Sequence, residues 1–282
     1  MPPTPPVILS IAGFDPSSGA GVSADIKTIG AHGCYGLGCI TALTVQSTQG
    51  VRKVEPVSGK LIAEMLRELA NDISISAVRI GMLGNGEVVD AVGNFLGSVK
   101  PPNVVLDPIL KSTSGAKLLN NHGPEKLRSL IPLAHVLTPN IEEAAALSGV
   151  PVTNLEQMKV AALKLHDMGA ANVVVTGGHL EKAIDLLSIK QAQGPPKQTE
   201  FGSNLLRSTS THGTGCAFAT AVACNLALGR QLEDAVIMAK VYVTKAIAKG
   251  YPLGKGPGPL NHLYRMEETP RPAAEFVEPV HR

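Results

Sequence analysis

Residues 7–28 read VILSIAGFDPSSGAGVSADIKT. They begin with a short apolar run, Val7–Ala12, continue through a glycine-containing loop, residues 13–21, and end in an amphipathic stretch that carries Asp25. A short apolar run followed by a longer stretch with helical spacing is typical of a buried strand that leads into a helix. We therefore expect this segment to be the first strand, loop and helix of an α/β fold.

The same alternation of short apolar runs and longer amphipathic stretches continues along the chain. The further runs that we expect to be strands are Ile40–Val45, Ala77–Ile80, Val104–Leu106, Val136–Thr138 and Val173–Thr176. Continuous apolar runs of this kind are typical of parallel strands that are covered by helices on both faces. The pattern predicts a three-layer α/β/α sandwich with a mainly parallel central sheet.

Two of the amphipathic stretches carry apolar stripes. One stripe consists of Leu61, Met65, Leu69 and Ile73, and the other of Leu155, Met158, Ala162 and Leu165. Spacing of three and four residues places each set on one side of a helix, and we expect both sides to face the core.

The last part of the chain departs from the alternation of short apolar runs and longer amphipathic stretches. Ile184–Ile189 and Thr199–Phe201 flank a Gln-Gly-Pro-Pro sequence and predict a hairpin. A final pair of helices is expected at Gly215–Leu228 and Leu232–Lys249, before the sequence GKGPGP at 254–259 ends the pattern. Because no linker or shift in composition divides the chain, we expect one domain over residues 1–266 and a flexible tail over residues 267–282.

The composition is typical of a compact folded protein. Hydrophobic residues make up 44% of the 282 positions and charged residues 17%, so disorder of the bulk is excluded. The net charge is +2, and aromatic residues make up only 3% with no Trp. The chain therefore has neither a strongly basic surface nor stacking platforms, and we expect no nucleic-acid partner.

Cysteine usage and apolar runs predict the location of the protein. The four cysteines form no CxxC pair and lie in apolar surroundings, which suits a reducing compartment better than a disulfide framework. No apolar run reaches the roughly 18 residues that span a bilayer. The opening MPPTPP lacks the basic and apolar regions of a signal peptide. We expect a cytoplasmic protein that does not enter a membrane.

The strongest functional signal is THGTGCAFATA at residues 211–221. Gly213 and Gly215 allow unusual backbone angles directly before an apolar helix, and the amides at a helix start carry partial positive charge. Such a loop suits an anion, such as a phosphoryl group during its transfer, and Thr214 can add a hydroxyl. The alternative is an ordinary glycine-containing turn that begins a helix.

Cys216 is expected in the first turn of this helix. Amides at a helix N-terminus lower the pKa of a thiol, so Cys216 is a candidate thiolate or general base. The alternative is a small buried apolar residue, which is the interpretation that we prefer for Cys224 on the same helix.

The loop after the first strand holds one carboxylate, and the helix that follows it holds another. The chain has no Gly-Lys-Ser or Gly-Lys-Thr, so this is not a P-loop, and the glycine spacing differs from the dinucleotide-binding motif. From the residues alone, Asp15 is expected to cap a turn and Asp25 to be a solvated helix carboxylate.

Polar residues also follow two later strands. Asp107 comes directly after an apolar strand, and Asn140 and Glu143 follow the next one. Mg²⁺ is typically held by one or two carboxylates together with waters and phosphate oxygens, so Asp107 and Glu143 are candidate ligands. The alternative for Asn140 and Glu143 is a helix cap with its capping-box partner.

Taken in order, seven motifs resemble those of the hydroxymethylpyrimidine and phosphomethylpyrimidine kinases of thiamine biosynthesis, members of the ribokinase-like superfamily. These motifs are SIAGFDPSSGAGVSADIKT (10–28), TALTVQST (41–48), IGML (80–83), DPI (107–109), TPNIEEA (138–144), GGHL (177–180) and HGTGC (212–216). The resemblance extends from about residue 7 to residue 264. It implies a ribokinase-like fold.

The activity implied by this resemblance is ATP-dependent phosphorylation of 4-amino-5-hydroxymethyl-2-methylpyrimidine and then of its monophosphate, with ATP and Mg²⁺ as the implied cofactors. Cys216 takes the position of the catalytic base, which related pyridoxal and sugar kinases fill with an aspartate. Gly213, Thr214 and Gly215 complete the anion hole with it. A homodimer is also implied.

The same motif matching implies further roles. Gly13, Asp25, Gln46 and Met82 fall at positions that surround the pyrimidine. Asn140 and Glu143 match the family's Asn-x-x-Glu motif near the metal and the ATP phosphates, and Asp107 matches the acidic residue on the neighbouring strand, so Asp107 and Glu143 are the implied metal residues. Gln46 can both donate and accept a hydrogen bond, which suits an aminopyrimidine edge.

This chain departs from the family pattern at the nucleotide side. Many relatives have a lysine before Gly-Gly-His, where this chain has Thr176, so we expect the cationic contact to the phosphates to be lost or to come from elsewhere, for example from Lys111. The second phosphorylation brings two anionic groups together and is expected to be the more sensitive step. Two alternatives stay open: a pyridoxal, pyridoxine or pyridoxamine kinase, and a pyrimidine-binding sensor without turnover.

Overall fold

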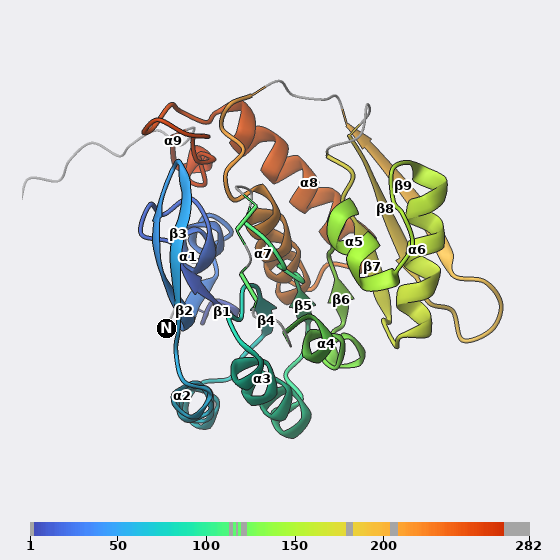
Figure 1. Cartoon of the computed structure of the whole chain (residues 1–282), viewed down its shortest axis with the longest axis horizontal. Helices are drawn as coiled ribbons and strands as arrows, with labels where there is room; N and C mark the ends of the chain where they lie inside the picture. Colours follow the sequence, from blue (N-terminus) through green and yellow to red (C-terminus); the bar gives the residue numbers. More distant parts are fainter. Residues whose placement is uncertain are drawn as a thin grey trace, which may run out of the picture.

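The computed structural model describes residues 3–112, 115–116, 118–119, 123–178, 183–203 and 208–267. Within this part, the strands form one sheet in the order β3-β2-β1-β4-β5-β6-β7-β8-β9 (Figure 1). The strands are β1 Val7–Phe14, β2 Tyr35–Ser47, β3 Gly50–Pro56, β4 Ala77–Ile80, β5 Val104–Leu106, β6 Val136–Leu137, β7 Asn172–Val175, β8 Ala183–Ile189 and β9 Lys197–Ser203. The six strands from β2 to β7 in this order pair in parallel, and β3, β8 and β9 are antiparallel to their neighbours. The predicted mainly parallel sheet is confirmed.

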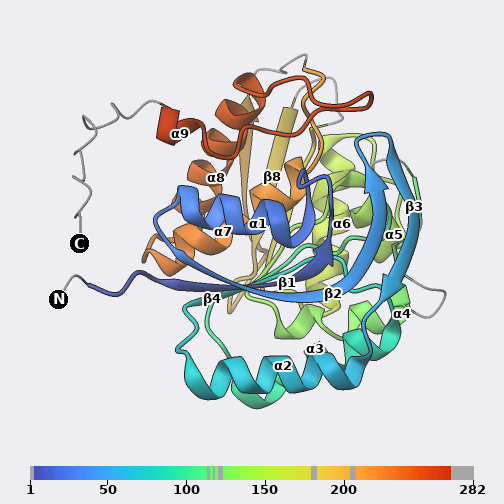
Figure 2. The same ribbon diagram turned by 90° about the vertical axis from the view of Figure 1, so that its left-hand side faces the viewer.

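Helices cover both faces of this sheet (Figure 1, Figure 2). One face packs against α2 Gly59–Asp72, α3 Gly86–Val99, α4 Gly123–Arg128, α5 Ile141–Ser148 and α6 Leu155–Asp167, with a short 3₁₀ helix at Ile131–Leu133. The other face packs against α1 Gly21–Ala31, α7 Thr214–Ala227, α8 Leu232–Ala248 and α9 Tyr264–Glu267. Successive strand residues alternate between the two apolar cores: Ile8 joins the α7 side, whereas Leu9 and Ile11 join the α2 side. This arrangement is the predicted three-layer sandwich.

The structure corrects the predicted elements in two places. The first two strands are longer than predicted, and β3 was not predicted, because its sequence GVRKVEP mixes charged residues with only two valines. In α2, Met65, Leu69 and Ile73 of the predicted stripe pack against the core beside the fully buried Ile62 and Leu66, whereas Leu61 is 48% exposed. The predicted core side of α2 is therefore confirmed except at Leu61.

The remaining predicted elements are confirmed with small shifts. Met158, Ala162 and Leu165 of α6 are fully buried, β8 and β9 form the predicted hairpin, and α7 and α8 form the final pair. All four cysteines are free thiols. No helix in the described part of the chain is long and apolar enough to cross a membrane. The predicted tail lies outside the described residues, apart from Glu267 at the end of α9.

Helix α7 lies under the middle of the sheet and is buried along nearly its whole length. Its side facing the sheet is rich in alanine, and the small side chains let the helix approach both the sheet and α8 closely. The N-terminus of α7 thereby reaches the edge where the parallel strands end. This placement brings residues 213–216 beside the loops that follow the strands.

Candidate active site

The carboxyl ends of the strands surround a cavity of about 390 Å³. Its wall consists of residues that follow β1, β2 and β4 to β7, the start of α7, and one side of α8. Ligands of open α/β sheets bind at this edge because loops and helix N-termini gather there. The predicted site residues that line it are Gly13, Gln46, Met82, Asp107, Asn140, Glu143, Thr176, Gly213, Thr214, Gly215 and Cys216, and Lys111 lines it too.

Of the two glycines in the anion loop, Gly213 has the unusual backbone angle that was predicted, whereas the φ of Gly215 is ordinary. Gly213 is the N-cap of α7 with a φ of 85°, in the left-handed region that favours glycine. A Cβ at Gly213 would also overlap the carbonyl oxygen of Gly19, so this position has no room for a side chain. The first amides of α7 therefore open into the cavity, where the positive end of the helix dipole favours an anion.

Cys216 lies in the first turn of α7, as predicted, but its ionisation differs from the expectation. Burial raises the pKa of the Cys216 thiol to about 11, although the Arg79 guanidinium and a hydrogen bond from the Gly21 amide act in the opposite direction. The prediction that the pKa is lowered is wrong for the protein without ligands, because only 9% of the residue is exposed and desolvation outweighs the effects of Arg79 and of the Gly21 amide. Cys216 is a neutral thiol at neutral pH.

Arg79 on β4 is a site residue that the sequence analysis missed. Its side chain is fully buried yet lines the cavity, and its guanidinium bridges two carboxylates. Nη1 lies 3.1 Å from Asp25 Oδ2, and Nη2 lies 2.7 Å from Asp107 Oδ2. A Cβ at Gly81 would overlap Nη1, so the glycine makes room for this side chain. The signal in the sequence was a charged residue inside the apolar run Ala77–Ile80.

Asp25 is the predicted substrate residue that does not line the cavity. It is fully buried, so the expectation of a solvated carboxylate is wrong. Besides the ion pair with Arg79, it accepts hydrogen bonds from Ser10 Oγ at 2.6 Å and from Thr220 Oγ1 at 2.7 Å. The structure places Asp25 behind Arg79, so it holds the guanidinium instead of facing the cavity.

Asn140 and Glu143 form a capping box at the start of α5. Asn140 Oδ1 accepts from the Glu143 amide at 2.9 Å, and Glu143 Oε2 accepts from the Asn140 amide at 3.0 Å. The helix-cap interpretation is therefore confirmed, and both residues also line the cavity.

Glu143 and Asp107 are neighbouring buried carboxylates. Burial raises the pKa of Glu143 to about 8, and the charge of Asp107 adds to the shift. Burial also raises the pKa of Asp107 to about 6 against the opposing effect of Arg79. A divalent cation between two such carboxylates would favour their charged forms, and the oxygen donors are those that Mg²⁺ prefers. The donor set therefore fits Mg²⁺.

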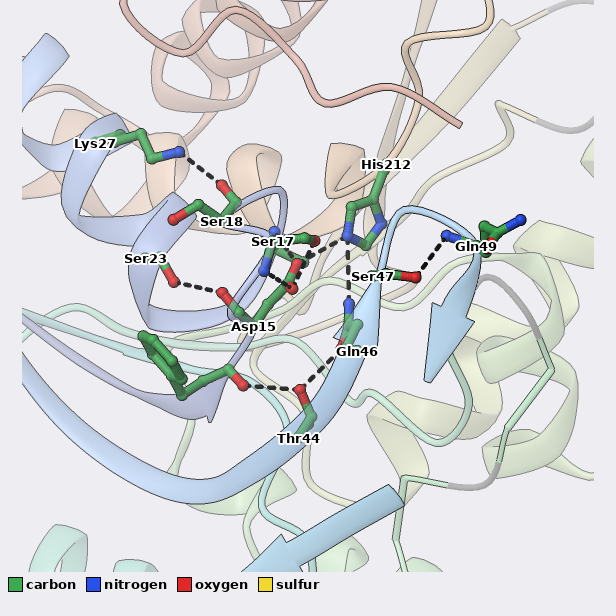
Figure 3. A network of polar contacts seen from close by, with 12 residues as sticks. Asp15, Ser17, Ser18, Ser23, Lys27, Thr44, Gln46, Ser47, Gln49 and His212 are labelled. Carbon is green, nitrogen blue, oxygen red and sulfur yellow. Dashed lines mark hydrogen bonds and ion pairs between the residues drawn. The ribbon is translucent and has the colours of Figure 1, made fainter. Parts of the chain in front are cut away.

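The side of the cavity near β2 carries a network around Asp15 (Figure 3). Asp15 Oδ1 accepts from the Ser17 amide at 2.8 Å, which is the predicted turn cap, and Oδ2 lies 2.9 Å from His212 Nε2. His212 Nε2 in turn lies 3.3 Å from Gln46 Nε2. Between this network and β4, Gly13 and Met82 pack so closely that a Cβ at Gly13 would lie 2.9 Å from the Met82 sulfur.

The opposite end of the cavity is built from Thr176, the turn after it, and α8. Asp185 Oδ1 accepts from the Gly177 amide at 3.0 Å, and Asp185 Oδ2 lies 2.5 Å from Lys240 Nζ. Lys240 lines the cavity on the side of Thr176, whereas Lys111 lies in the loop after β5. The sequence analysis did not identify Lys240, because a lysine in an amphipathic helix gives no sign that it faces a cavity.

Comparisons with known proteins identify the family of this chain. A family model described as Phosphomethylpyrimidine kinase matches residues 15–261. The chain is 38% identical over 257 residues to a hydroxymethylpyrimidine/phosphomethylpyrimidine kinase of Haemophilus influenzae, covering 90% of this chain and 96% of the relative. It is 39% identical over 265 residues to the thiamine biosynthesis bifunctional protein ThiED of Geobacter sulfurreducens; the match covers 93% of this chain and only 53% of that longer protein.

Solved structures extend the comparison to the fold. An ADP complex of Bacillus subtilis pyridoxal kinase has a TM-score of 0.84 at 32% identity, with 93% of this chain and all of that chain covered. Phosphomethylpyrimidine kinase from Clostridium difficile has a TM-score of 0.76 at 36% identity, with 86% of this chain and 99% of that chain covered. The fold is ribokinase-like, and the chain belongs to the phosphomethylpyrimidine kinase family.

Proposed function

We propose that this protein transfers the terminal phosphoryl group of ATP to 4-amino-5-hydroxymethyl-2-methylpyrimidine and then to its monophosphate, in thiamine biosynthesis. The observation that carries the proposal is one cavity that combines the anion loop 213–216 and the Cys216 thiol with the Asp107–Glu143 carboxylate pair. Phosphoryl transfer needs alignment and neutralisation of charge, and these groups supply both.

The anion loop and Cys216 act on the reacting atoms. The amides of residues 213–216 bind the phosphoryl group and stabilise charge on its equatorial oxygens, because hydrogen-bond donors at a helix N-terminus are already in place when that charge develops. Cys216 in its thiolate form accepts the hydroxymethyl proton as the new phosphorus–oxygen bond forms. Arg79 stabilises this thiolate electrostatically, and burial opposes it.

The pyrimidine lies in the part of the cavity next to Gly13, Gln46 and Met82. Gly13 and Met82 offer an apolar surface for the ring, and Gln46 offers an amide edge for its polar substituents. Asp25 acts through Arg79 and not by direct contact.

The nucleotide lies at the other end, near Asn140 and Thr176. Asp107 and Glu143 would hold Mg²⁺, and the bound ion would supply positive charge that neutralises the phosphates. Lys240 and Lys111 are the lysines of this wall among the described residues: Lys240, which is paired with Asp185, lies on the side of Thr176, and Lys111 lies in the loop after β5.

The specific observation that supports a second candidate is the similarity to B. subtilis pyridoxal kinase. Pyridoxal, pyridoxine or pyridoxamine would use the same nucleotide site, and discrimination would depend on the Gln46 side of the cavity. A pyrimidine-binding sensor without turnover is disfavoured because the carboxylates and the anion loop are all in place.

We further propose that residues 1–266 form a single kinase domain in the cytoplasm and that the protein is a homodimer. In support of a dimer, Leu43 and Val45 on β2 are 52% and 56% exposed, on the side of the strand opposite to Thr44 and Gln46. Sedimentation of the full chain tests this proposal. A Leu43→Ser and Val45→Ser variant is expected to shift toward the monomer.

Release of ADP in the presence of ATP and Mg²⁺ tests the proposed function. Hydroxymethylpyrimidine, its monophosphate and pyridoxal are supplied separately, with the Cys216→Ala variant as the matched control. Turnover on both pyrimidines, lost in the variant, is the expected result. Turnover on pyridoxal alone would establish the second candidate, and ligand binding without ADP release would establish the sensor.

A further inference from the structure

Three loops meet at the side chain of His212, which the proposed mechanism does not use. His212 directly precedes the anion loop, Asp15 belongs to the loop between β1 and α1, and Gln46 lies near the end of β2. The imidazole Nε2 lies 2.9 Å from Asp15 Oδ2 and 3.3 Å from Gln46 Nε2 (Figure 3). His212 therefore links the loop that binds the anion to the strand that carries the substrate amide.

The contacts of Asp15 determine which atom carries the proton. Its carboxylate accepts from the amide and hydroxyl of Ser17 and from the amide of Ala20, in addition to the contact with His212. Burial opposes ionisation, but the hydrogen bonds from His212 and Ser17 outweigh it and lower the pKa of Asp15 below its usual range. An ionised carboxylate can only accept, so His212 Nε2 must carry a hydrogen and donate it to Asp15.

This proton assignment constrains Gln46. Because Nε2 of His212 carries a hydrogen, it has no lone pair for an amide nitrogen, so the Gln46 amide, 3.3 Å away, must turn its oxygen toward His212 and accept from Nε2. The amide nitrogen then donates to Thr44 Oγ1, which lies 3.2 Å from the Gln46 amide and gives its own hydrogen to the Phe14 carbonyl oxygen at 2.9 Å. The amide therefore keeps one N–H and one oxygen lone pair for a ligand in the cavity that Gln46 lines.

The imidazole ring is held in place from several directions. The His212 amide donates to the carbonyl oxygen of Gly258 at 3.1 Å, which fixes the backbone. Gly19 lies against the ring, and a Cβ there would overlap the ring carbon Cδ2. Gly19 is not in the left-handed region, so space for the His212 ring, and not backbone conformation, is the reason for a glycine.

We propose that His212, held by Asp15, is a positioning residue that fixes the amide edge of Gln46 toward the substrate and thereby determines the choice between an aminopyrimidine and a pyridine. This inference rests on the proposed function. An aminopyrimidine presents a ring nitrogen acceptor beside an exocyclic amino donor, which matches an amide edge. Pyridoxal has no such adjacent pair, so a fixed amide favours the pyrimidine, and a mobile amide favours it less.

Steady-state kinetics of two different variants test the proposal. His212→Leu removes the donor, and Gly19→Ala leaves Asp15, His212 and Gln46 intact but displaces the ring. Both are expected to raise KM for hydroxymethylpyrimidine about 10- to 100-fold while KM for ATP stays within about twofold. The preference for hydroxymethylpyrimidine over pyridoxal should fall by a similar factor. His212→Gln, whose amide nitrogen can donate to Asp15, should recover most of the loss.

Matched controls separate positioning from loss of folding. Gly30→Ala in α1 is the glycine control, because a Cβ there meets nothing within 4 Å. His135→Leu is the histidine control, since His135 does not line the cavity. Both controls should retain the wild-type KM values, and thermal melting of every variant reports folding.

The outcomes distinguish this proposal from the one on which it rests. Folded His212→Leu and Gly19→Ala variants with wild-type KM and selectivity would overturn the role of His212 and leave the kinase function intact. A parallel rise of KM for both substrates and for ATP would also overturn it, because that result indicates a general structural effect. A wild-type enzyme that phosphorylates neither pyrimidine would overturn the proposed function together with this inference.

Discussion

At the scale of single residues, Arg79 has the largest electrostatic role in the cavity wall. Its guanidinium lies between Asp25 and Asp107 in the interior of the sheet, where a charge without a partner is costly. The pairing lets two carboxylates stay buried beside the thiol of Cys216. Lysine cannot replace it fully, because one ammonium group lacks the fork that reaches both carboxylates.

Arg79→Met is expected to lower the free energy of unfolding by about 3–5 kcal/mol and to abolish turnover, because it leaves two buried carboxylates without a cation. Urea unfolding and ADP release measure the two effects. In the double variant with Asp25→Asn, one of the carboxylate charges is gone, so part of the lost stability should return. Equal stability of Arg79→Met and the wild type would show that the buried pair is not ionised.

Cys216 gives a prediction about pH. The thiol must lose its proton before it can act as a base, and its pKa is raised to about 11 by burial. Below that pKa the thiolate fraction grows with pH, so kcat is expected to rise between about pH 7 and pH 9. Cys216→Ala should lower kcat about 10²- to 10⁴-fold and remove the pH dependence. A wild-type kcat that stays flat across this range would argue against Cys216 as the base.

At the scale of elements, the start of α7 depends on Gly213, one of the two glycines that the sequence predicted to have unusual backbone angles. Gly213 combines a φ of 85° with contact to the Gly19 carbonyl, so Gly213→Ala meets both backbone strain and overlap. We expect a loss of at least about 2 kcal/mol in the free energy of unfolding, measured in urea. Gly215→Ala is the control for stability, since a Cβ there meets nothing within 4 Å and its φ is ordinary. Equal stability of the two variants would contradict this account of the loop.

Asn140 and Glu143 form the capping box of α5 and also line the cavity. Asn140→Ala removes the cap of α5 and is expected to lower stability by about 1 kcal/mol in urea unfolding. It also frees Glu143, whose position beside Asp107 the cap maintains, so we expect KM for Mg·ATP to rise while KM for the pyrimidine changes little. A rise confined to KM for the pyrimidine would contradict this prediction, because it would place Asn140 at the pyrimidine end of the cavity.

At the scale of the whole molecule, two histidines, the buried His262 and the half-buried His32, link the stability of the fold to pH. Burial lowers the pKa of His32 and of His262 to about 4, from a usual value near 6.5. The unfolded chain therefore binds more protons between these two values. The stability due to each histidine is complete above about pH 6.5 and is lost as pH falls toward 4, with a maximum loss on the order of 3 kcal/mol for each.

Urea unfolding of the wild type and of His262→Gln at pH 7.5, 6 and 5 checks this linkage. The pKa values of Glu143 and Asp107 are raised in the folded protein and shift stability in the opposite direction, so the comparison of the two proteins isolates the histidine. Both rings contact Thr28 of α1, His32 through the Thr28 carbonyl and His262 through its hydroxyl, so their protonation would disturb the same helix. The free energy of unfolding of the wild type minus that of His262→Gln is expected to fall at each step of decreasing pH. A difference that is independent of pH would show that His262 accepts a proton in the folded state.

The architecture was predicted well because a parallel strand that is buried on both faces consists of a continuous run of apolar residues, which is easy to see in the sequence. The sequence analysis missed β3, an edge strand with charged residues, and it placed Leu61 of α2 in the core although this side chain is 48% exposed. Both errors arise where tertiary contacts, and not local pattern, decide which side chains are covered.

The cavity was predicted less completely, because its electrostatics depend on residues brought together from distant strands. Asp25 appeared to be a free carboxylate until its partner on β4 was known, and the pKa of Cys216 follows from burial that spacing cannot show. The sequence likewise shows that Arg79 and Lys240 are charged, but it does not show that they line the cavity.

Mass spectrometry of the products formed from hydroxymethylpyrimidine, excess ATP and Mg²⁺ tests the central claim most directly. The account predicts that the pyrimidine monophosphate forms first and is then converted into the diphosphate, and that both form about 10²- to 10⁴-fold more slowly with Cys216→Ala. The absence of any phosphorylated pyrimidine from the folded wild-type protein, with pyridoxal phosphate formed in a parallel reaction or with no product at all, would contradict it.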